Sequence, residues 1–233
     1  YAQKKSDYSY INNKNRYSGK IKNIFKSKKI KSKLVLVDRY DCALLLKRIN
    51  NNYFKTNSGI ENFAFAYKIA KNLKINNKII IKALNNFKGL PHRQEIVFKK
   101  KNLVCINDSK ATSFDATLQC LLNHNKIYWI VGGLPKKKDY FNLKNISKKI
   151  IKAYIIGKKT SFFKKQIQNK IPSKVSRSIK KALQDIRNDL KSSKNENCSV
   201  LFSPAAASFD QFLNFRERGE YFKKNAIQIL KNK

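Results

Sequence analysis

The chain has 233 residues, of which 42% are hydrophobic and 12% aromatic, so it can bury a sizeable core and is not a wholly disordered chain. It contains no run of about 18 apolar residues, and its first thirty residues are polar and lysine-rich, so we expect no membrane insertion, no secretory signal and a cytoplasmic location. The net charge of +38 points to nucleic acid or an anionic surface, unless the lysines form only a solvated coat.

The first 88 residues are predicted to contain two strands followed by two helices. Apolar runs predict the strands, and apolar residues at helical spacing predict the helices. The expected strands are 33–38 and 41–49, and the expected helices are 61–73 and 77–87. Asn76 or Asn77 can cap the second helix. This region resembles the end of another domain that precedes an α/β unit.

From about residue 89 onward, short apolar runs alternate with helical patterns. The expected strands are 102–107, 127–131, 152–157 and 198–203. The expected helices are 113–123, 141–150, 161–169, 176–190 and 208–230. This alternation predicts βαβ units and an α/β fold with a doubly wound, mostly parallel sheet. Strands that are apolar throughout indicate a sheet buried on both faces.

Three of the predicted strands end in unusual polar loops. The loops are NDSKAT (107–112), GGLPKKKD (132–139) and SPAAASFDQF (203–212). Ligands of open parallel sheets bind beyond the carboxyl ends of the strands, and helix starts there favour anions. Lys110 and Lys136 add positive charge, while Thr112 and Ser208 can donate hydrogen bonds, so the edge suits a small substrate with carboxylates. Each loop taken alone is better explained by helix caps and turns, and it is the three loops on one predicted edge that favour a site.

Two further features bear on chemistry. In GLPHRQE (89–95), Arg93 follows Pro91 at the expected domain boundary and can bind phosphate, whereas His92 is more often structural. The four cysteines show no Cys-x-x-Cys spacing and are predicted to be small buried side chains, so we expect no metal site.

Arginine is scarce among the basic residues. Only 8 of the 52 are arginine, the side chain preferred for bidentate contacts with bases and phosphates. The lysines are spread along the chain and accompany abundant Asn and Ile, as drift toward A/T-rich codons would produce. We therefore expect no nucleic-acid partner and keep a basic nucleic-acid-binding module as the alternative from a different class.

Four motifs occur together in one order: FKGLPHRQE, INDSKAT, VGG followed by Lys136 and Asp139, and SPAAASFDQFLNFRERGEYF. With them, residues 57–233 resemble the C-terminal portion of the D-glutamate-adding branch of the Mur ligase family. The resemblance implies that residues 1–88 are a remnant of the central ATP-binding domain. It implies that residues 89–233 are the Rossmann-like, glutamate-binding C-terminal domain.

The resemblance also implies a reaction. Such ligases use ATP and Mg²⁺ to phosphorylate the carboxylate of UDP-N-acetylmuramoyl-L-alanine, and the amine of D-glutamate then attacks the acyl phosphate during peptidoglycan synthesis. The full-length enzyme is expected to be a monomer. Another Mur ligase or a folylpolyglutamate-type ligase is the alternative within the enzyme class.

Residue roles follow from the resemblance by motif. The expected D-glutamate ligands are Lys110, Thr112, Lys136, Ser208 and Phe215, and the expected ATP contacts are Asn62, Arg93 and Asp108. Ser58-Gly59 stand where the family has His-Asn. The seven glycines form no phosphate loop, no methionine is present and the sequence starts at Tyr1. We therefore expect a piece of a longer protein, without catalytic residues or magnesium ligands of its own, that does not catalyse ligation alone.

Overall fold

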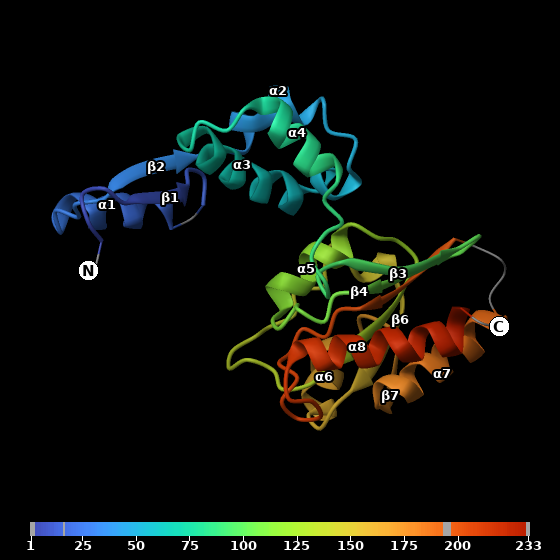
Figure 1. Cartoon of the computed structure of the whole chain (residues 1–233). Coiled ribbons are helices and arrows are strands. Elements are labelled where there is room, and N and C mark those ends of the chain that lie inside the picture. The colour runs from blue at the N-terminus through green and yellow to red at the C-terminus, as the bar shows by residue number, and fades with distance from the viewer. Residues whose placement is uncertain (1–2, 16, 193–196, 232–233) are drawn as a thin grey trace. The chain divides into compact units, whose positions relative to one another are not determined.

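The computed structural model describes residues 3–15, 17–192 and 197–231 and divides into two compact units, Tyr1–Lys88 and Gly89–Lys233 (Figure 1). We call them unit 1 and unit 2. The elements of unit 1 are β1 (Tyr8–Asn12), α1 (Ser18–Ser27), β2 (Lys33–Val37), η1 (Arg39–Cys42), α2 (Ala43–Leu46), η2 (Asn52–Lys55), α3 (Asn57–Asn72) and α4 (Asn77–Asn85). Strands β1 and β2 pair in parallel, with Tyr8 opposite Lys33 and Asn12 opposite Val37.

Unit 2 is an α/β unit whose six-stranded sheet has the order β3-β4-β8-β5-β6-β7. The strands are β3 (Glu95–Lys100), β4 (Leu103–Asn107), β5 (Ile127–Gly132), β6 (Ile150–Ile156), β7 (Ser173–Arg177) and β8 (Cys198–Phe202). The helices are α5 (Phe114–Leu122), η3 (Ser147–Lys149), α6 (Thr160–Ile167), α7 (Ile179–Ser192), α8 (Phe215–Ala226) and the π-helical η4 (Ile227–Lys231). All pairings are parallel except β3 with β4. The predicted doubly wound, mostly parallel sheet is confirmed.

Helices cover both faces of the sheet in unit 2 (Figure 1). On one face, Phe114 of α5 and Phe163 of α6 pack with Trp129 of β5. On the other face, Leu183 of α7 and Phe222 of α8 belong to a second apolar cluster. All six residues of β5 are buried, as expected for a strand that is central in a parallel sheet.

The predicted strand at 41–49 is wrong, because this segment is helical. The Asp38 side chain accepts a hydrogen bond from Tyr40 N (3.1 Å), and the Asp41 side chain accepts one from Asp38 N (2.8 Å). This reciprocal capping box starts η1, which leads into α2. The buried residues Cys42, Leu45 and Ile49 are spaced by three and four, which suits a helix rather than a strand.

The predicted helix at 141–150 is also wrong. This segment contains only the short η3 before β6 begins. Phe141, Leu143 and Ile146 are all buried in the core. Residues two apart point in different directions on a helix, so a helix could not bury both Phe141 and Leu143 on one face.

Several boundaries differ from prediction. The last helix starts at Phe215 rather than near Ser208, because the Asn214 side chain caps it by accepting hydrogen bonds from the backbone of the first turn. Helix α7 starts at Ile179 rather than at 176, because Ser176 and Arg177 belong to β7. Strands β1, β3 and β7 and helix α1 were not predicted. In β7 only Ser176 is buried, so this edge strand has no apolar run to reveal it.

Candidate functional site

The three polar loops leave adjacent parallel strands. Strands β4, β8 and β5 are neighbours in the sheet and run in the same direction, so their carboxyl ends share one edge. Backbone hydrogen bonds join the loops that follow β5 and β8: Gly132 N to Pro204 O (2.9 Å), and Leu134 with Ala207 in both directions (3.0 and 2.9 Å). Asp108 N donates to Phe202 O at 2.7 Å, which brings the loop after β4 to the end of β8. The three loops therefore form one rim.

Arg218 of α8 fills the point where these loops meet. Its Nε donates to Ser109 Oγ (3.0 Å), and its Nη2 donates to Ser109 O (2.7 Å). Its Nη1 donates to Ala206 O at 3.0 Å. The side chain is buried, and burial lowers its pKa to about 10. This value is still well above 7, so Arg218 stays protonated at neutral pH.

Lys110 and Phe215 lie against one another on this rim. The Lys110 amine is 3.9 Å from the centroid of the Phe215 ring, a cation–π contact. Ser109 Oγ donates to Phe215 O at 2.8 Å, so two consecutive loop residues contact the first residue of α8. Lys110 is exposed and Phe215 is half-buried, so the amine borders solvent.

Lys136 lies on the loop after β5, which is tied to the start of α5. Asp139 on the same loop accepts a hydrogen bond from Phe114 N at 2.9 Å and so serves as a cap from outside the helix. Ser113, at the N-cap position of α5, makes no side-chain cap bond. The hydrogen bond that Asp139 accepts from Phe114 N holds the Lys136 loop next to the segment that carries Thr112.

Asp108 points inward from the rim. Its Oδ2 accepts from Ser203 Oγ (2.7 Å), and its Oδ1 accepts from Gln94 N (3.2 Å). Ser203 Oγ also lies 3.0 Å from Thr117 Oγ1. Burial raises the pKa of Asp108 to about 6, although the hydrogen bonds from Ser203 and Gln94 favour the carboxylate.

His92 packs beneath the rim. Its Nδ1 lies 2.9 Å from Asn107 Nδ2, and its carbonyl accepts from Lys110 N at 2.9 Å. Burial lowers its pKa, which favours the neutral imidazole. His92 and Ala205 have left-handed φ values of 62° and 55°, a conformation that non-glycine residues rarely adopt and that clusters at functional sites.

The predicted site residues divide between the two units. Lys110, Thr112, Lys136, Ser208 and Phe215 all belong to the rim or to the start of α8, and Arg93 and Asp108 adjoin it. Asn62 is exposed on α3 in unit 1. The roles of these residues in binding D-glutamate and ATP stay predictions.

Sequence reasoning missed Arg218 and the capping role of Asp139. One signal could have found Arg218: in a chain where lysine fills most basic positions, a retained arginine marks a site that needs a planar, multidentate donor. Asp139 gave no such signal, because its partner lies on another element.

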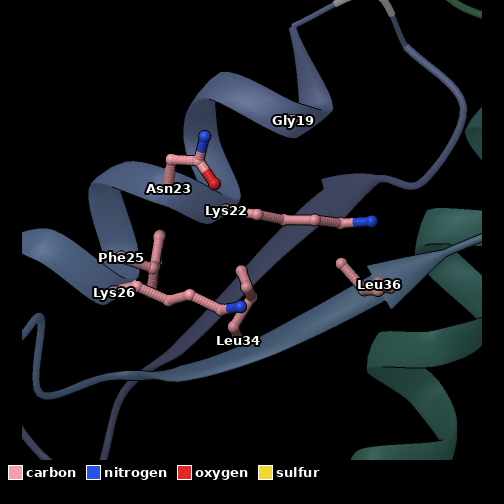
Figure 2. A pocket seen from close by; sticks show the side chains of 7 residues that line it. All are labelled: Gly19, Lys22, Asn23, Phe25, Lys26, Leu34 and Leu36. Atoms are coloured by element: carbon pink, nitrogen blue, oxygen red, sulfur yellow. The ribbon is translucent and has the colours of Figure 1, made fainter.

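A separate hollow of about 410 Å³ lies in unit 1 between α1 and β2 (Figure 2). Phe25, Leu34 and Leu36 line it together with Lys22 and Lys26, and Figure 2 shows the helix above the strand. This lining has no carboxylate, hydroxyl or imidazole, and its only titratable groups are the amines of Lys22 and Lys26.

Neither a metal cluster nor a membrane span is found within the described ranges. Among those residues, no group of three or more His, Cys, Asp or Glu side chains could hold a metal ion. In the same part of the chain, no helix is both long and apolar enough to cross a membrane.

Two solved ligase structures share a low-scoring likeness with the chain. UDP-N-acetylmuramate–alanine ligase from Thermotoga maritima is 15% identical, with a TM-score of 0.49 over 74% of this chain and 38% of that chain. A bifunctional folylpolyglutamate synthase/dihydrofolate synthase from Yersinia pestis is 14% identical, with a TM-score of 0.48 over 72% of this chain and 39% of that chain.

Comparison with curated proteins gives closer sequence relatives. No protein-family model matches the chain. UDP-N-acetylmuramoylalanine–D-glutamate ligase from Rhizobium meliloti is 38% identical over 162 residues, which are 70% of this chain and 35% of that protein. The ligase of the same name from Phenylobacterium zucineum is 39% identical over 170 residues, 73% of this chain and 36% of that protein. The chain thus spans about a third of these relatives, and it resembles the C-terminal portion of UDP-N-acetylmuramoylalanine–D-glutamate ligase, a Mur ligase.

Proposed function

We propose that this chain is the D-glutamate-binding part of a ligase that adds D-glutamate to UDP-N-acetylmuramoyl-L-alanine in peptidoglycan synthesis. One observation carries the proposal: the loops that hold Lys110, Lys136 and Ser208 leave three adjacent parallel strands at one edge and are hydrogen-bonded into one rim. Ligands of such sheets bind at this edge.

The rim suits a doubly anionic amino acid. The amines of Lys110 and Lys136 are exposed and can each pair with a carboxylate, a bond that is stronger than a neutral hydrogen bond. Thr112 and Ser208 add hydroxyl donors from two different loops. Phe215 holds the Lys110 amine through its ring, which limits the entropy that Lys110 loses when it binds ligand.

The proposed reaction is ATP-dependent and ADP-forming. In it, the residues of this chain bind and orient D-glutamate so that its amine faces the activated carboxyl group of the muramoyl substrate. Arg93 and Asn62 are proposed to contact ATP through phosphate charge and hydrogen bonding. Asp108 is proposed to contact the nucleotide too, although both of its carboxylate oxygens already accept hydrogen bonds. Each of these oxygens keeps a further lone pair, so a nucleotide hydroxyl could donate to Asp108 without displacing either bond.

Magnesium is proposed to act together with ATP, and among the described residues no group of three or more His, Cys, Asp or Glu side chains could hold the ion by itself. No step is therefore assigned to a magnesium ion held by this chain. We also expect no phosphate release when the chain alone is mixed with ATP, D-glutamate and UDP-N-acetylmuramoyl-L-alanine.

The test is a titration of the ¹⁵N-labelled chain with D-glutamate, followed by amide shifts in two-dimensional NMR. We expect saturable shifts at the three rim loops and weaker binding of L-glutamate. Lys136→Ala and Ser208→Ala should each weaken D-glutamate binding, by about tenfold or more for the lysine, because a hydrogen bond to a charged group is lost.

Lys137→Ala is the matched control, since Lys137 is an exposed lysine on the same loop. It removes the same charge but no proposed hydrogen bond to the ligand, so the affinity should stay within about twofold, because an exposed charge without a direct contact contributes little. Shifts spread evenly over the surface, or equal losses in Lys136→Ala and Lys137→Ala, would contradict the proposed site. Tight DNA binding that falls steeply with salt would instead favour the nucleic-acid alternative.

A further inference from the structure

Arg218 hydrogen-bonds to two loops of the rim through one side chain and lies beside the third. It donates to Ser109 after β4 and to Ala206 after β8. A Cβ atom built on Gly133, after β5, would lie 3.4 Å from Arg218 Nη1, so this loop passes directly beside the guanidinium. The guanidinium group is planar and rigid, so it fixes the spacing between the groups that it contacts.

The contacts of Arg218 are unusual for a buried charge. It is 2% exposed, and the hydrogen bonds of its guanidinium group go to uncharged oxygens. Among the ion pairs of the described residues, none joins Arg218 to a carboxylate within 4.0 Å. Burying a charge is costly, and the charge of Asp210 acts on Arg218 only from beyond ion-pair distance, so stability alone is a weak reason for an arginine here.

Helix α8 brings Arg218 and a proposed ligand residue to the same place. Phe215 and Arg218 are three residues apart, so they share one face of the helix. Phe215 contacts Lys110, and Arg218 contacts Ser109, the residue immediately before it. Asn214 caps the helix through the backbone of Arg216 (2.9 Å) and Glu217 (3.0 Å), which fixes where this face begins.

We propose that Arg218 is a positioning residue that sets the distance between the Lys110, Lys136 and Ser208 loops, and thereby selects the chain length of the acidic amino acid. This inference rests on the proposed function, in which different loops hold the two carboxylates. D-Glutamate and D-aspartate differ by one methylene group, so loops held at one spacing discriminate between them. Loops free to shift lose that discrimination.

A purely structural role for Arg218 makes a different prediction. If the guanidinium only stabilised the fold, its replacement would lower stability and reduce the binding of both amino acids by the same factor. If it sets the loop spacing, replacement changes the ratio of the two affinities. This ratio is the readout that a stabilising role does not move.

The experiment compares D-glutamate and D-aspartate dissociation constants, measured by NMR titration of the full 233-residue chain. Arg218→Lys keeps the charge but removes the planar fork. We expect it to weaken D-glutamate binding by about tenfold or more, since a displacement of about 1 Å is already costly. Binding of D-aspartate should change less. The dissociation constant of D-aspartate divided by that of D-glutamate should therefore fall toward one.

Two further variants keep the test decisive. Ser109→Ala removes the hydroxyl that accepts from Arg218 Nε without burying or exposing a charge, and it should reproduce part of the lost selectivity even if Arg218→Lys folds poorly. Lys224→Met removes an exposed positive charge from the same helix and should leave both affinities unchanged.

The outcomes separate this inference from the proposed function. Wild-type chain that binds D-glutamate selectively, with Arg218→Lys and Ser109→Ala keeping the same selectivity, would overturn the inference alone. A wild-type chain that binds neither amino acid would overturn the proposed function and this inference with it. Selectivity lost in both variants and kept in Lys224→Met supports the role of Arg218.

Discussion

The two units of this chain bury their parallel strands to very different extents. In unit 2, every residue of β5 is buried and helices cover both faces of the sheet. In unit 1, β1 has no buried residue and β2 has only Val37. Parallel sheets normally occur with both faces covered. The comparison shows that a complete layered core belongs to unit 2, whereas the strand pair of unit 1 is only partly covered.

The same contrast extends to the space around the strands. The hollow between α1 and β2 leaves Leu34 half-buried and Leu36 exposed (Figure 2). Unit 1 does have an apolar cluster, which includes Phe54 of η2 and Phe63 of α3, but the strand pair contributes only Val37 to its buried residues. We therefore expect unit 2 to be the more stable unit, and the predictions below test this difference.

The largest expected effect is the pH dependence of Asp108 in unit 2. Burial raises its pKa to about 6, above the ordinary value of 3.8, so the folded state favours the protonated carboxyl group. The stabilisation is complete below pH 3.8 and is lost as the pH rises through about 6. The loss amounts to about 3 kcal/mol, because each tenfold change in an acid dissociation constant corresponds to about 1.4 kcal/mol.

Asp108→Asn removes this dependence. We expect the unfolding free energy of wild type minus that of the variant to fall between about pH 4 and pH 6 and to level off above, as measured by urea unfolding. Burial lowers the pKa of His92 and of His124, so both histidines destabilise the folded state at acid pH. This effect is the same in wild type and in Asp108→Asn, so it cancels in the difference. A flat difference between wild type and variant would show that folding does not raise the pKa of Asp108.

In unit 1, the backbone hydrogen bond from Tyr40 lowers the pKa of Asp38, so the stability that Asp38 contributes is lost as the pH falls below 3.8.

The second prediction compares a glycine in each unit. A Cβ at Gly219 in α8 would lie 2.3 Å from His92 Nδ1, so Gly219→Ala forces the helix and His92 apart. We expect a loss of about 1 to 3 kcal/mol, typical of overpacking. A Cβ at Gly19 in α1 would meet nothing within 4 Å, so Gly19→Ala should stabilise unit 1 by about 0.5 to 1 kcal/mol.

The single tryptophan makes this comparison measurable. Trp129 is the only tryptophan and lies in unit 2, so its fluorescence reports the unfolding of that unit, whereas circular dichroism reports both. Gly219→Ala should shift the fluorescence transition, and Gly19→Ala should leave it in place. A fluorescence shift with Gly19→Ala would mean that the two units unfold as one.

Sequence reasoning succeeded where the signal was local. The apolar runs that became β4, β5, β6 and β8 were found because buried parallel strands carry their signal in consecutive residues. The rim was predicted because a parallel sheet brings its strand ends to one edge, whatever the details of packing. The strand predicted at 41–49 failed, because the reciprocal caps of Asp38 and Asp41 outweighed an apolar run.

The interactions that complete the rim had no local signal. Arg218 bonds to Ser109, which is 109 positions earlier in the chain, and no pattern within α8 identifies that partner. Strand β7 was missed because its exposed polar residues resemble a loop and only pairing with β6 makes it a strand. Such features depend on tertiary contacts, which override local preference.

The smallest expected effect concerns the start of α4 in unit 1, where the sequence left two candidate caps. Asn76 is the cap, because its Oδ1 accepts from Lys78 N at 2.8 Å. The Oδ1 of Asn77 is buried and, among the described residues, has no hydrogen-bond partner. Asn76→Ala should therefore destabilise unit 1 by about 1 kcal/mol through the lost cap.

Asn77→Ala is the matched control, because it changes the neighbouring residue in the same way. It removes an unsatisfied buried oxygen and places a better helix former in the first turn, so unit 1 should keep or slightly gain stability. Circular dichroism during urea unfolding measures both variants, and the fluorescence of Trp129 should not move in either. Equal losses in the two variants would mean that both asparagines support the helix. A loss only in Asn77→Ala would reverse the assignment of the cap.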